Sequence, residues 1–362
     1  MQENSSYLTE QIITYLGNKR ALLDFLNEGF FYAKNELGRD KFSFCDLFSG
    51  SGIVSRFAKA HSNFIVANDL EEYSSVINRC YLSNQTKELL ENIELCFEKL
   101  RAKDEIKEGF ISKLYAPKND SDIKKDERVF YTRQNALAID TIRQNIEKFI
   151  PNDLKVYFIA PLLYLASVHT NTSGVFKGFY KNKDGVGEFG GRGKNALSRI
   201  MKPIELQKPI FSNFSLPFEV LKKDAISLSK QIDTDVCYLD PPYNQHPYGS
   251  NYFMLNIIAN YKEPKEISKV SGITKDWNRS LFNKEAKAKD SLLEIVSNLR
   301  SKIILISYNC EGFIKKEEFL KELVKFGEVK FIEKRYNTFR GSRNLNSQPL
   351  HIKEQLYIVK KS

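Results

Sequence analysis

The sequence predicts an α/β protein in which a sheet with crossover helices is interrupted by one long insertion. Short β-rich apolar runs alternate with stretches whose apolar positions recur every three or four residues. Several of the runs end at a polar residue followed by Gly, Pro or Asn, and ligands of open α/β sheets bind beyond the carboxyl ends of such strands. The second and third predicted strands are too far apart along the chain for a single crossover helix.

The predicted strands cover residues 42–48, 63–69, 218–222, 236–240, 302–308, 328–335 and 355–360. The predicted helices are amphipathic and include residues 19–31, 53–60, 71–84 and 284–299. We therefore expect residues 1–84 and 216–362 to form one sheet-based domain. Residues 85–215 are expected to form an inserted, mainly helical region.

Charge favours a polyanionic partner. The 362 residues are 42% hydrophobic, enough for a sizeable core, and 55 Lys and Arg face 45 Asp and Glu, a formal charge of +10. This excess favours nucleic acid first and an acidic membrane surface second. Seven of the 18 glycines and eight basic residues against three acidic ones fall in 169–208. Such a segment allows close approach to phosphates, although a solvated surface loop has the same composition.

Cysteine and histidine usage points to the cytoplasm and away from metal chemistry. The five cysteines are odd in number, widely spread and without a CxxC pair, which is typical of reduced thiols. The four histidines are not spaced with a cysteine as metal ligands would be, so we expect no metal site. No secretory signal is evident, and no apolar run approaches the roughly 20 residues of a membrane span.

The first motif is DLFSGSG at residues 46–52, where a predicted strand ends in a carboxylate and turns tightly into a helix. Glycines at such a turn let a ligand approach the backbone N–H groups. The motif is not the dinucleotide fingerprint, because Ser55 replaces its third glycine. Asp69, 23 residues after Asp46, ends the next strand, where a carboxylate could accept both hydroxyls of a ribose. A capping or turn aspartate is the structural alternative for Asp46.

The second motif, DPPY, comprises Asp240, Pro241, Pro242 and Tyr243 and follows an apolar strand. Two prolines fix φ and donate no N–H, so carbonyls and a carboxylate form a rigid cluster of acceptors. Such a cluster suits an amino group with two hydrogens, and Tyr243 offers a face on which a base can stack. A stiff turn at the end of a strand is the structural alternative.

A third motif, YLGNK at residues 15–19, leads into an amphipathic helix, and the order of all three motifs is informative. The chain resembles the alpha class of DNA adenine-N6 methyltransferases, the Dam-like family, in the order of its motifs. This order is YxGxK, then DLFSGSG with AND at 67–69, then a long variable insert, and then DPPY. The resemblance covers nearly the whole chain and is weakest over residues 85–215, where this family keeps its target-recognition region. It implies a Rossmann-like methyltransferase sheet, S-adenosylmethionine as cofactor and no metal. One departure is Tyr15, where some members carry Trp.

The resemblance also implies roles for individual residues. Asp240, Pro241, Pro242 and Tyr243 would be catalytic, and the S-adenosylmethionine site would comprise Tyr15, Gly17, Lys19, Asp46, Phe48, Ser49, Gly50, Gly52, Asp69, Leu70, Asp224 and Asp240. Candidate contacts to DNA are Lys177, Lys181, Lys183, Arg192, Lys194, Arg199, Tyr248, Tyr252, Arg340 and Arg343. For any one of these candidates, a solvated surface side chain is the alternative.

The expected reaction is site-specific transfer of a methyl group to the N6 amino group of adenine in duplex DNA. The target base would flip out of the helix onto Tyr243. A related enzyme acting on cytosine N4, RNA or a protein amide is the main alternative, although such enzymes more often carry Ser or Asn in place of Asp240. Cytosine-C5 methylation would need a Pro-Cys dipeptide, which the chain lacks. A dinucleotide-dependent oxidoreductase would not use DPPY, and a non-catalytic DNA-binding module would not need both motifs.

The expected setting follows from this assignment. We expect a monomer in the bacterial cytoplasm, associated with the nucleoid through DNA. This class of enzyme commonly works in restriction–modification, so a restriction endonuclease acting on the same site is a candidate partner, and a solitary regulator is the alternative.

Overall fold

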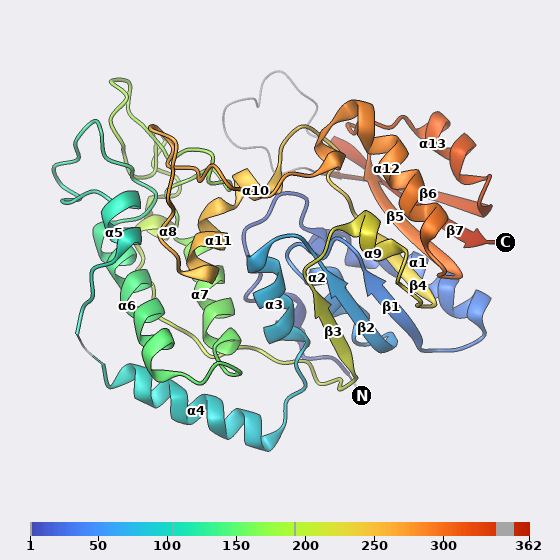
Figure 1. Ribbon diagram of the computed structural model, residues 1–362, viewed down its shortest axis with the longest axis horizontal. Helices are drawn as coiled ribbons and strands as arrows, with labels where there is room; N and C mark the ends of the chain where they lie inside the picture. Colours follow the sequence, from blue (N-terminus) through green and yellow to red (C-terminus); the bar gives the residue numbers. More distant parts are fainter. Residues whose placement is uncertain (1, 104, 192, 338–350) are drawn as a thin grey trace.

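A seven-stranded sheet and a helical body make up the protein (Figure 1). The computed structural model describes residues 2–103, 105–191, 193–337 and 351–362. The strands are β1 (Phe42–Asp46), β2 (Ser62–Asn68), β3 (Phe218–Leu221), β4 (Val236–Leu239), β5 (Ile303–Asn309), β6 (Gly327–Asn337) and β7 (His351–Lys361). Each corresponds to a predicted strand, which confirms the α/β class.

Strand order places the carboxyl ends of three motif-bearing strands at one edge of the sheet. The order is β3-β2-β1-β4-β5-β7-β6, with β1 to β5 parallel and β7 antiparallel to both of its neighbours. β1 lies between β2 and β4, so the chain leaves β1 toward one side and returns to its other side much later. Ligands bind at such a switch point, beyond the carboxyl ends of the strands.

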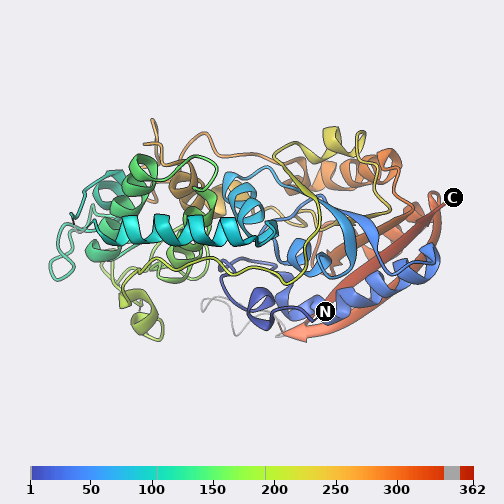
Figure 2. The same cartoon turned by 90° about the horizontal axis from the view of Figure 1, so that it is seen from below.

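Helices cover both faces of the sheet (Figure 2). One face packs against α1 (Leu23–Leu37) and α2 (Ile53–Ala58), and the other against α9 (Ala225–Ser229), α12 (Glu285–Asn298) and α13 (Lys316–Leu323). Strand side chains alternate between the two cores, as the pleat requires: Tyr238 and Leu305 enter the first, whereas Cys237 and Ile304 enter the second. Because both faces are buried, the central strands appear in the sequence as continuous apolar runs.

The first predicted helix is displaced in the structure. Residues Lys19–Leu22 form a 3₁₀ turn (η2), and α1 begins only at Leu23 and continues to Leu37. The Asn18 side chain accepts a hydrogen bond from the Arg20 N–H and so caps the turn rather than an α-helix. At the other end, Gly38 adopts the left-handed conformation that ends α1.

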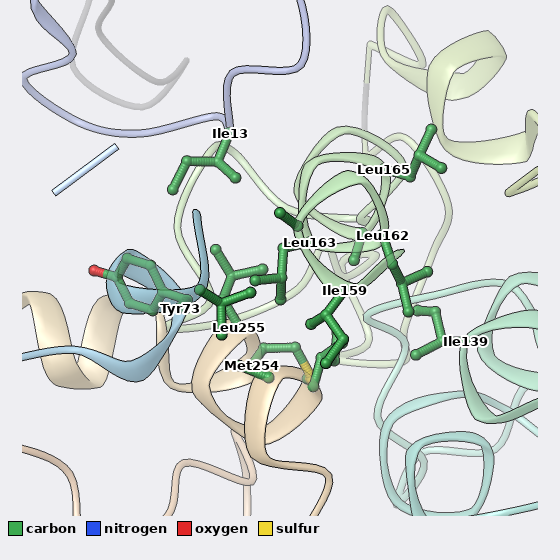
Figure 3. Close-up of a cluster of buried hydrophobic side chains, with 14 of the residues drawn as sticks. Ile13, Tyr73, Ile139, Ile159, Leu162, Leu163, Leu165, Met254 and Leu255 are labelled. Carbon is green, nitrogen blue, oxygen red and sulfur yellow. The ribbon is translucent and has the colours of Figure 1, made fainter. Parts of the chain in front are cut away.

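The helical body has its own apolar core, shown in Figure 3. Its helices are α3 (Glu72–Leu82), α4 (Lys87–Arg101), α5 (Phe110–Tyr115), α6 (Arg133–Phe149), α7 (Val156–Val168), α8 (Leu197–Met201), α10 (Tyr248–Asn251) and α11 (Phe253–Asn260). Tyr73 of α3, Leu163 of α7 and Leu255 of α11 meet in this core. The helical body is therefore larger than residues 85–215, because it includes helices from both flanking stretches of the chain. In the described part of the chain, no helix combines the length and apolar character needed to cross a membrane.

The N-terminal segment is fastened to the sheet by Arg56 of α2. This side chain is buried and donates hydrogen bonds to the carbonyl oxygens of Tyr7, Glu10 and Gln11. Its guanidinium carbon lies 3.6 Å from the centre of the Tyr81 ring, a cation–π contact. The anchor fixes the start of the chain just before the YLGNK motif.

Candidate active site

A pocket that is partly open to solvent lies at the carboxyl ends of β1, β2 and β4. Its lining contains nearly all of the predicted cofactor residues: Tyr15, Gly17, Lys19, Asp46, Phe48, Ser49, Gly50, Asp69, Leu70, Asp224 and Asp240. Gly52 lies outside the lining, at the start of α2, where a Cβ atom would sit 2.9 Å from Oδ1 of Asn78. The sequence motifs therefore converge on one pocket.

The β1 turn supplies a buried carboxylate with one unused oxygen. Oδ2 of Asp46 accepts a hydrogen bond of 2.7 Å from the Ser55 hydroxyl, whereas the buried Oδ1 has no hydrogen-bond partner among the described residues. Burial is the main cause that raises the pKa of Asp46 to about 7. An oxygen left without a partner in a pocket wall calls for a donor from a ligand.

Asp69 shapes the same turn from the end of β2. Its Oδ2 accepts a hydrogen bond of 2.8 Å from the Gly50 N–H, and its Oδ1 accepts one of 2.9 Å from the Glu71 N–H. Gly50 has φ +48, a conformation that favours glycine. Asp224, which follows the neighbouring strand β3, caps α9 by accepting a hydrogen bond from the Ser227 N–H. The capping role of Asp224 adds a structural function to its predicted contact with the cofactor.

DPPY follows β4, and its aspartate joins a buried ion-pair triad. Nζ of Lys19 lies 3.1 Å from Oδ1 of Asp240 and 2.6 Å from Oε1 of Glu354 on β7. Burial opposes the charged form of Lys19, but the two carboxylates outweigh it and hold the pKa of Lys19 well above its usual range. Glu354 was not among the sequence-predicted site residues. Only the folded sheet brings it to residue 19.

The other DPPY residues are held around this carboxylate. Pro242 lines the pocket and Pro241 is buried, whereas Tyr243 stands at the margin and meets Tyr308 edge-on with ring centres 6.2 Å apart. The Tyr243 carbonyl accepts a hydrogen bond of 3.1 Å from the Phe313 N–H. A backbone contact to the loop after β5 thus positions the motif.

Tyr15 packs against two tyrosines that follow DPPY, and these two also stack on each other with ring centres 6.0 Å apart. Its ring centre lies 4.9 Å from that of Tyr248 and 4.6 Å from that of Tyr252, with both rings stacked. The Tyr248 hydroxyl donates to the Leu16 carbonyl, and the Leu16 N–H donates to the Tyr252 hydroxyl at 2.7 Å. Tyr248, predicted as a DNA contact, also lines the pocket, and Tyr252 is buried. The stack joins the N-terminal loop to α10.

A strap from the segment after α11 closes one side of the pocket. The pocket is lined by four residues of this strap and by Glu71, and no sequence pattern indicated any of the five. The strap residues are Asn278, Ser280, Phe282 and Asn283. The Asn278 side-chain amide donates to the Leu70 carbonyl at 3.1 Å and to Glu71 Oε2 at 3.2 Å. Asn283 donates to the Asn244 carbonyl just after DPPY.

The basic residues among the predicted DNA contacts fall into three groups. Four lysines of the glycine-rich segment are wholly or partly exposed: Lys177, Lys181, Lys183 and Lys194. Nζ of Lys177 is 3.5 Å from Nδ1 of His246, which lies shortly after DPPY. The Arg199 guanidinium donates to the carbonyls of Val168, Thr170 and Thr172 beyond α7, an engagement that does not favour a DNA contact. Arg192, Arg340 and Arg343 lie outside the described residues.

The structure is that of an α/β protein with a pocket at the carboxyl ends of its parallel strands, lined by several carboxylates. The family model for D12 class N6 adenine-specific DNA methyltransferases matches residues 15–338. The type II methyltransferase M.NlaIII of Neisseria lactamica is 30% identical over 97% of this chain and 100% of its own length. The type II methyltransferase M.CviAII of Paramecium bursaria Chlorella virus 1 is 29% identical over 96% of this chain and 98% of its own length.

A further relative is larger. The modification methylase StsI of Streptococcus sanguinis is 26% identical over 96% of this chain, which spans 52% of that protein. The chain belongs to the D12 class of N6 adenine-specific DNA methyltransferases and is a site-specific enzyme that methylates adenine in DNA. The expectation of an adenine-specific DNA methyltransferase is confirmed, and its cytosine and RNA alternatives are disfavoured.

Proposed function

We propose that S-adenosylmethionine is the methyl donor and binds in the pocket between DLFSGSG and DPPY. The observation that carries this proposal is the unused Oδ1 of Asp46, buried in the wall of the pocket that Asp240 also lines. The donor's amino group suits that oxygen, and its ribose hydroxyls suit Asp69. When bound, the cofactor supplies a methyl group already activated on a positively charged sulfur.

Asp240 and the Pro241 carbonyl are proposed to accept the two hydrogens of the target amino group. The lone pair of an adenine amino nitrogen is delocalised into the ring, which makes the nitrogen a poor nucleophile. Two acceptors on one side favour a pyramidal nitrogen whose lone pair points away from them. Acceptors held rigidly by prolines also stabilise the positive charge that develops on nitrogen.

Access to this amino group is proposed to require base flipping, with Tyr243 as the stacking platform beside Asp240. The Asp240 side chain is only 19% exposed and lines the pocket at the end of β4, where a base that remains paired in a duplex could not reach it. The hydrogen bond from the Phe313 N–H to the Tyr243 carbonyl would hold the backbone of this residue in place as the base enters.

The helical body is proposed to recognise duplex DNA, with the glycine-rich basic segment facing the phosphates. Lys177 supports this, because its contact with His246 places an exposed ammonium group next to the DPPY loop. We further propose that the enzyme is a monomer, works on the chromosome in the bacterial cytoplasm, and has a partner restriction endonuclease with the same recognition site.

One incubation tests the reaction as a whole. Purified protein is mixed with unmethylated genomic DNA and labelled S-adenosylmethionine, and methylated positions are mapped at base resolution. We expect label on adenine N6 in one short duplex context. Label on cytosine or only on RNA, or transfer that does not depend on S-adenosylmethionine, would contradict the proposal.

Asp46→Asn is expected to weaken S-adenosylmethionine binding by about tenfold or more. An amide N–H₂ in place of Oδ1 cannot accept a hydrogen bond from the ammonium group of the cofactor. A hydrogen bond to a charged group contributes about 1.5–3 kcal/mol. The Ser55 contact survives, since the amide oxygen can still accept it. Isothermal titration calorimetry gives the dissociation constant. Asp24→Asn, an exposed aspartate on α1, is the control and should bind like the unchanged protein.

Lys177→Ala is expected to weaken duplex binding uniformly across sequences and to reduce the salt dependence of the affinity by about one ion. Fluorescence anisotropy with a labelled duplex at several salt concentrations measures both quantities. Lys87→Ala is the matched control, because that side chain is 91% exposed at the start of α4, far from DPPY. An equal loss in both variants would argue against a specific contact by Lys177.

A further inference from the structure

Glu354 is a buried carboxylate that the proposed mechanism does not use. It lies on β7 opposite Asn309 of β5, so the strand ladder fixes its backbone. Its side chain is 2% exposed and does not line the pocket, and therefore it has no route to the cofactor or the base. Burial of a carboxylate is costly unless it is paired, and here the partner is Lys19 at 2.6 Å.

Lys19 is shared unequally between its two carboxylates. The Lys19 ammonium lies closer to Glu354, at 2.6 Å, than to Asp240, at 3.1 Å. Lys19 and Asp240 both line the pocket, and Asp240 is the more open of the two, with 19% of its side chain exposed against 4% for Lys19. One ammonium between two carboxylates leaves a net charge of −1 on this side of the pocket.

We propose that Glu354 is a positioning residue for methyl transfer, holding the Lys19 ammonium so that it engages Oδ1 of Asp240 and leaves Oδ2 as the acceptor for the target amino group. The inference rests on the proposed role of Asp240. Without the charge on Glu354, Lys19 would pair with Asp240 alone. A closer ammonium would draw electron density from that carboxylate and weaken it as an acceptor.

The pH dependence of the reaction carries a signature of this arrangement. The groups that face Asp240 are Lys19, Glu354 and Asp46, together with the neutral tyrosines Tyr238, Tyr243 and Tyr248. Burial first, then the charge of Glu354, raises the pKa of Asp240 to about 6, while Lys19 opposes both. Because an ionised carboxylate is a stronger acceptor than a protonated one and stabilises the positive charge that develops on nitrogen, the methylation rate should rise as pH passes upward through about 6.

The test compares Glu354→Gln with Glu354→Asp in the full-length enzyme. The measurement is the single-turnover rate of adenine methylation against pH, with enzyme in excess over duplex DNA. Glu354→Gln should lower the rate at the optimum about tenfold, as expected for a slightly misplaced acceptor. Glu354→Gln should also move the acid limb of the pH–rate profile, the range in which the rate rises with pH, to lower pH. The reason is that loss of the negative charge lowers the pKa of Asp240.

Glu354→Asp keeps the charge, and its acid limb should stay where it is in the unchanged enzyme. Glu333→Gln is the control, an exposed carboxylate of β6 paired with Lys353, and should alter neither quantity. A slower Glu354→Gln enzyme with an unmoved acid limb would mean that Glu354 only packs the sheet, and would overturn the inference. So would an unchanged rate. If the unchanged enzyme itself failed to methylate adenine, the proposed function would fall instead.

Discussion

Asp240→Ala lowers the single-turnover rate of adenine methylation by roughly 10²–10³-fold, the loss expected when a preorganised polar contact to a developing charge is removed. Duplex binding should be unchanged, because Asp240 sits in the pocket and not on the basic segment. The fold should also survive. Lys19 keeps its 2.6 Å contact with Glu354, so the variant leaves no buried ammonium without a carboxylate.

The rate is measured with labelled S-adenosylmethionine, and the duplex affinity by fluorescence anisotropy on the same preparation. Asp233→Ala is the control, an exposed aspartate shortly before β4, and should be fully active. Near-normal methylation by Asp240→Ala would remove DPPY from the mechanism. Joint loss of methylation and DNA affinity would point to misfolding, which the melting temperature would reveal.

Gly50→Val is expected to weaken S-adenosylmethionine binding by about a hundredfold, the effect of overfilling a packed site. A Cβ atom at this position would lie 3.0 Å from Cε1 and 3.2 Å from the hydroxyl of Tyr15. Tyr15 is held by its stack with Tyr248 and Tyr252 and cannot yield cheaply. A β-branched residue at φ +48 adds backbone strain.

Gly38→Val separates the two causes. Gly38 has φ +63, but nothing lies within 4 Å of the position its Cβ would take. Both variants should lose stability from the backbone conformation, and only Gly50→Val should lose the cofactor. Calorimetric titration and thermal melts of both proteins measure this. Equal cofactor affinity in the two variants would place the ligand away from the β1 turn.

Much of the site was predictable because it is made by strand ends. Asp46, Asp69 and Asp240 each follow a run of apolar residues, and parallel strands bring their carboxyl ends to one edge. Glycine at residue 50 and proline at residues 241 and 242 restrict or permit particular backbone conformations, and these preferences can be recognised from the sequence alone. The central strands β1, β4 and β5 were predictable because burial on both faces leaves few polar residues in them.

The remainder depends on contacts between distant parts of the chain. No local pattern indicates that β7 enters the sheet between β5 and β6, and only that order brings Glu354 to Lys19. Arg199 looks like a phosphate ligand in a basic segment, yet backbone carbonyls engage its guanidinium. The strap that carries Asn278 is an irregular loop without periodicity, and its latch to Glu71 forms only in the folded protein.

The position of β7 has a consequence for synthesis. β6 pairs with β7, and β7 pairs with β5, so in the described sheet the second-last strand joins only through the last one. The Lys19–Glu354 contact spans 335 residues of sequence. During synthesis, residue 19 can meet Glu354 only after the intervening chain and β7 have been made, whereas the helical body can form from segments closer in sequence. The environment of Asp240 is therefore expected to be completed by a contact of high sequence separation, which forms late in folding.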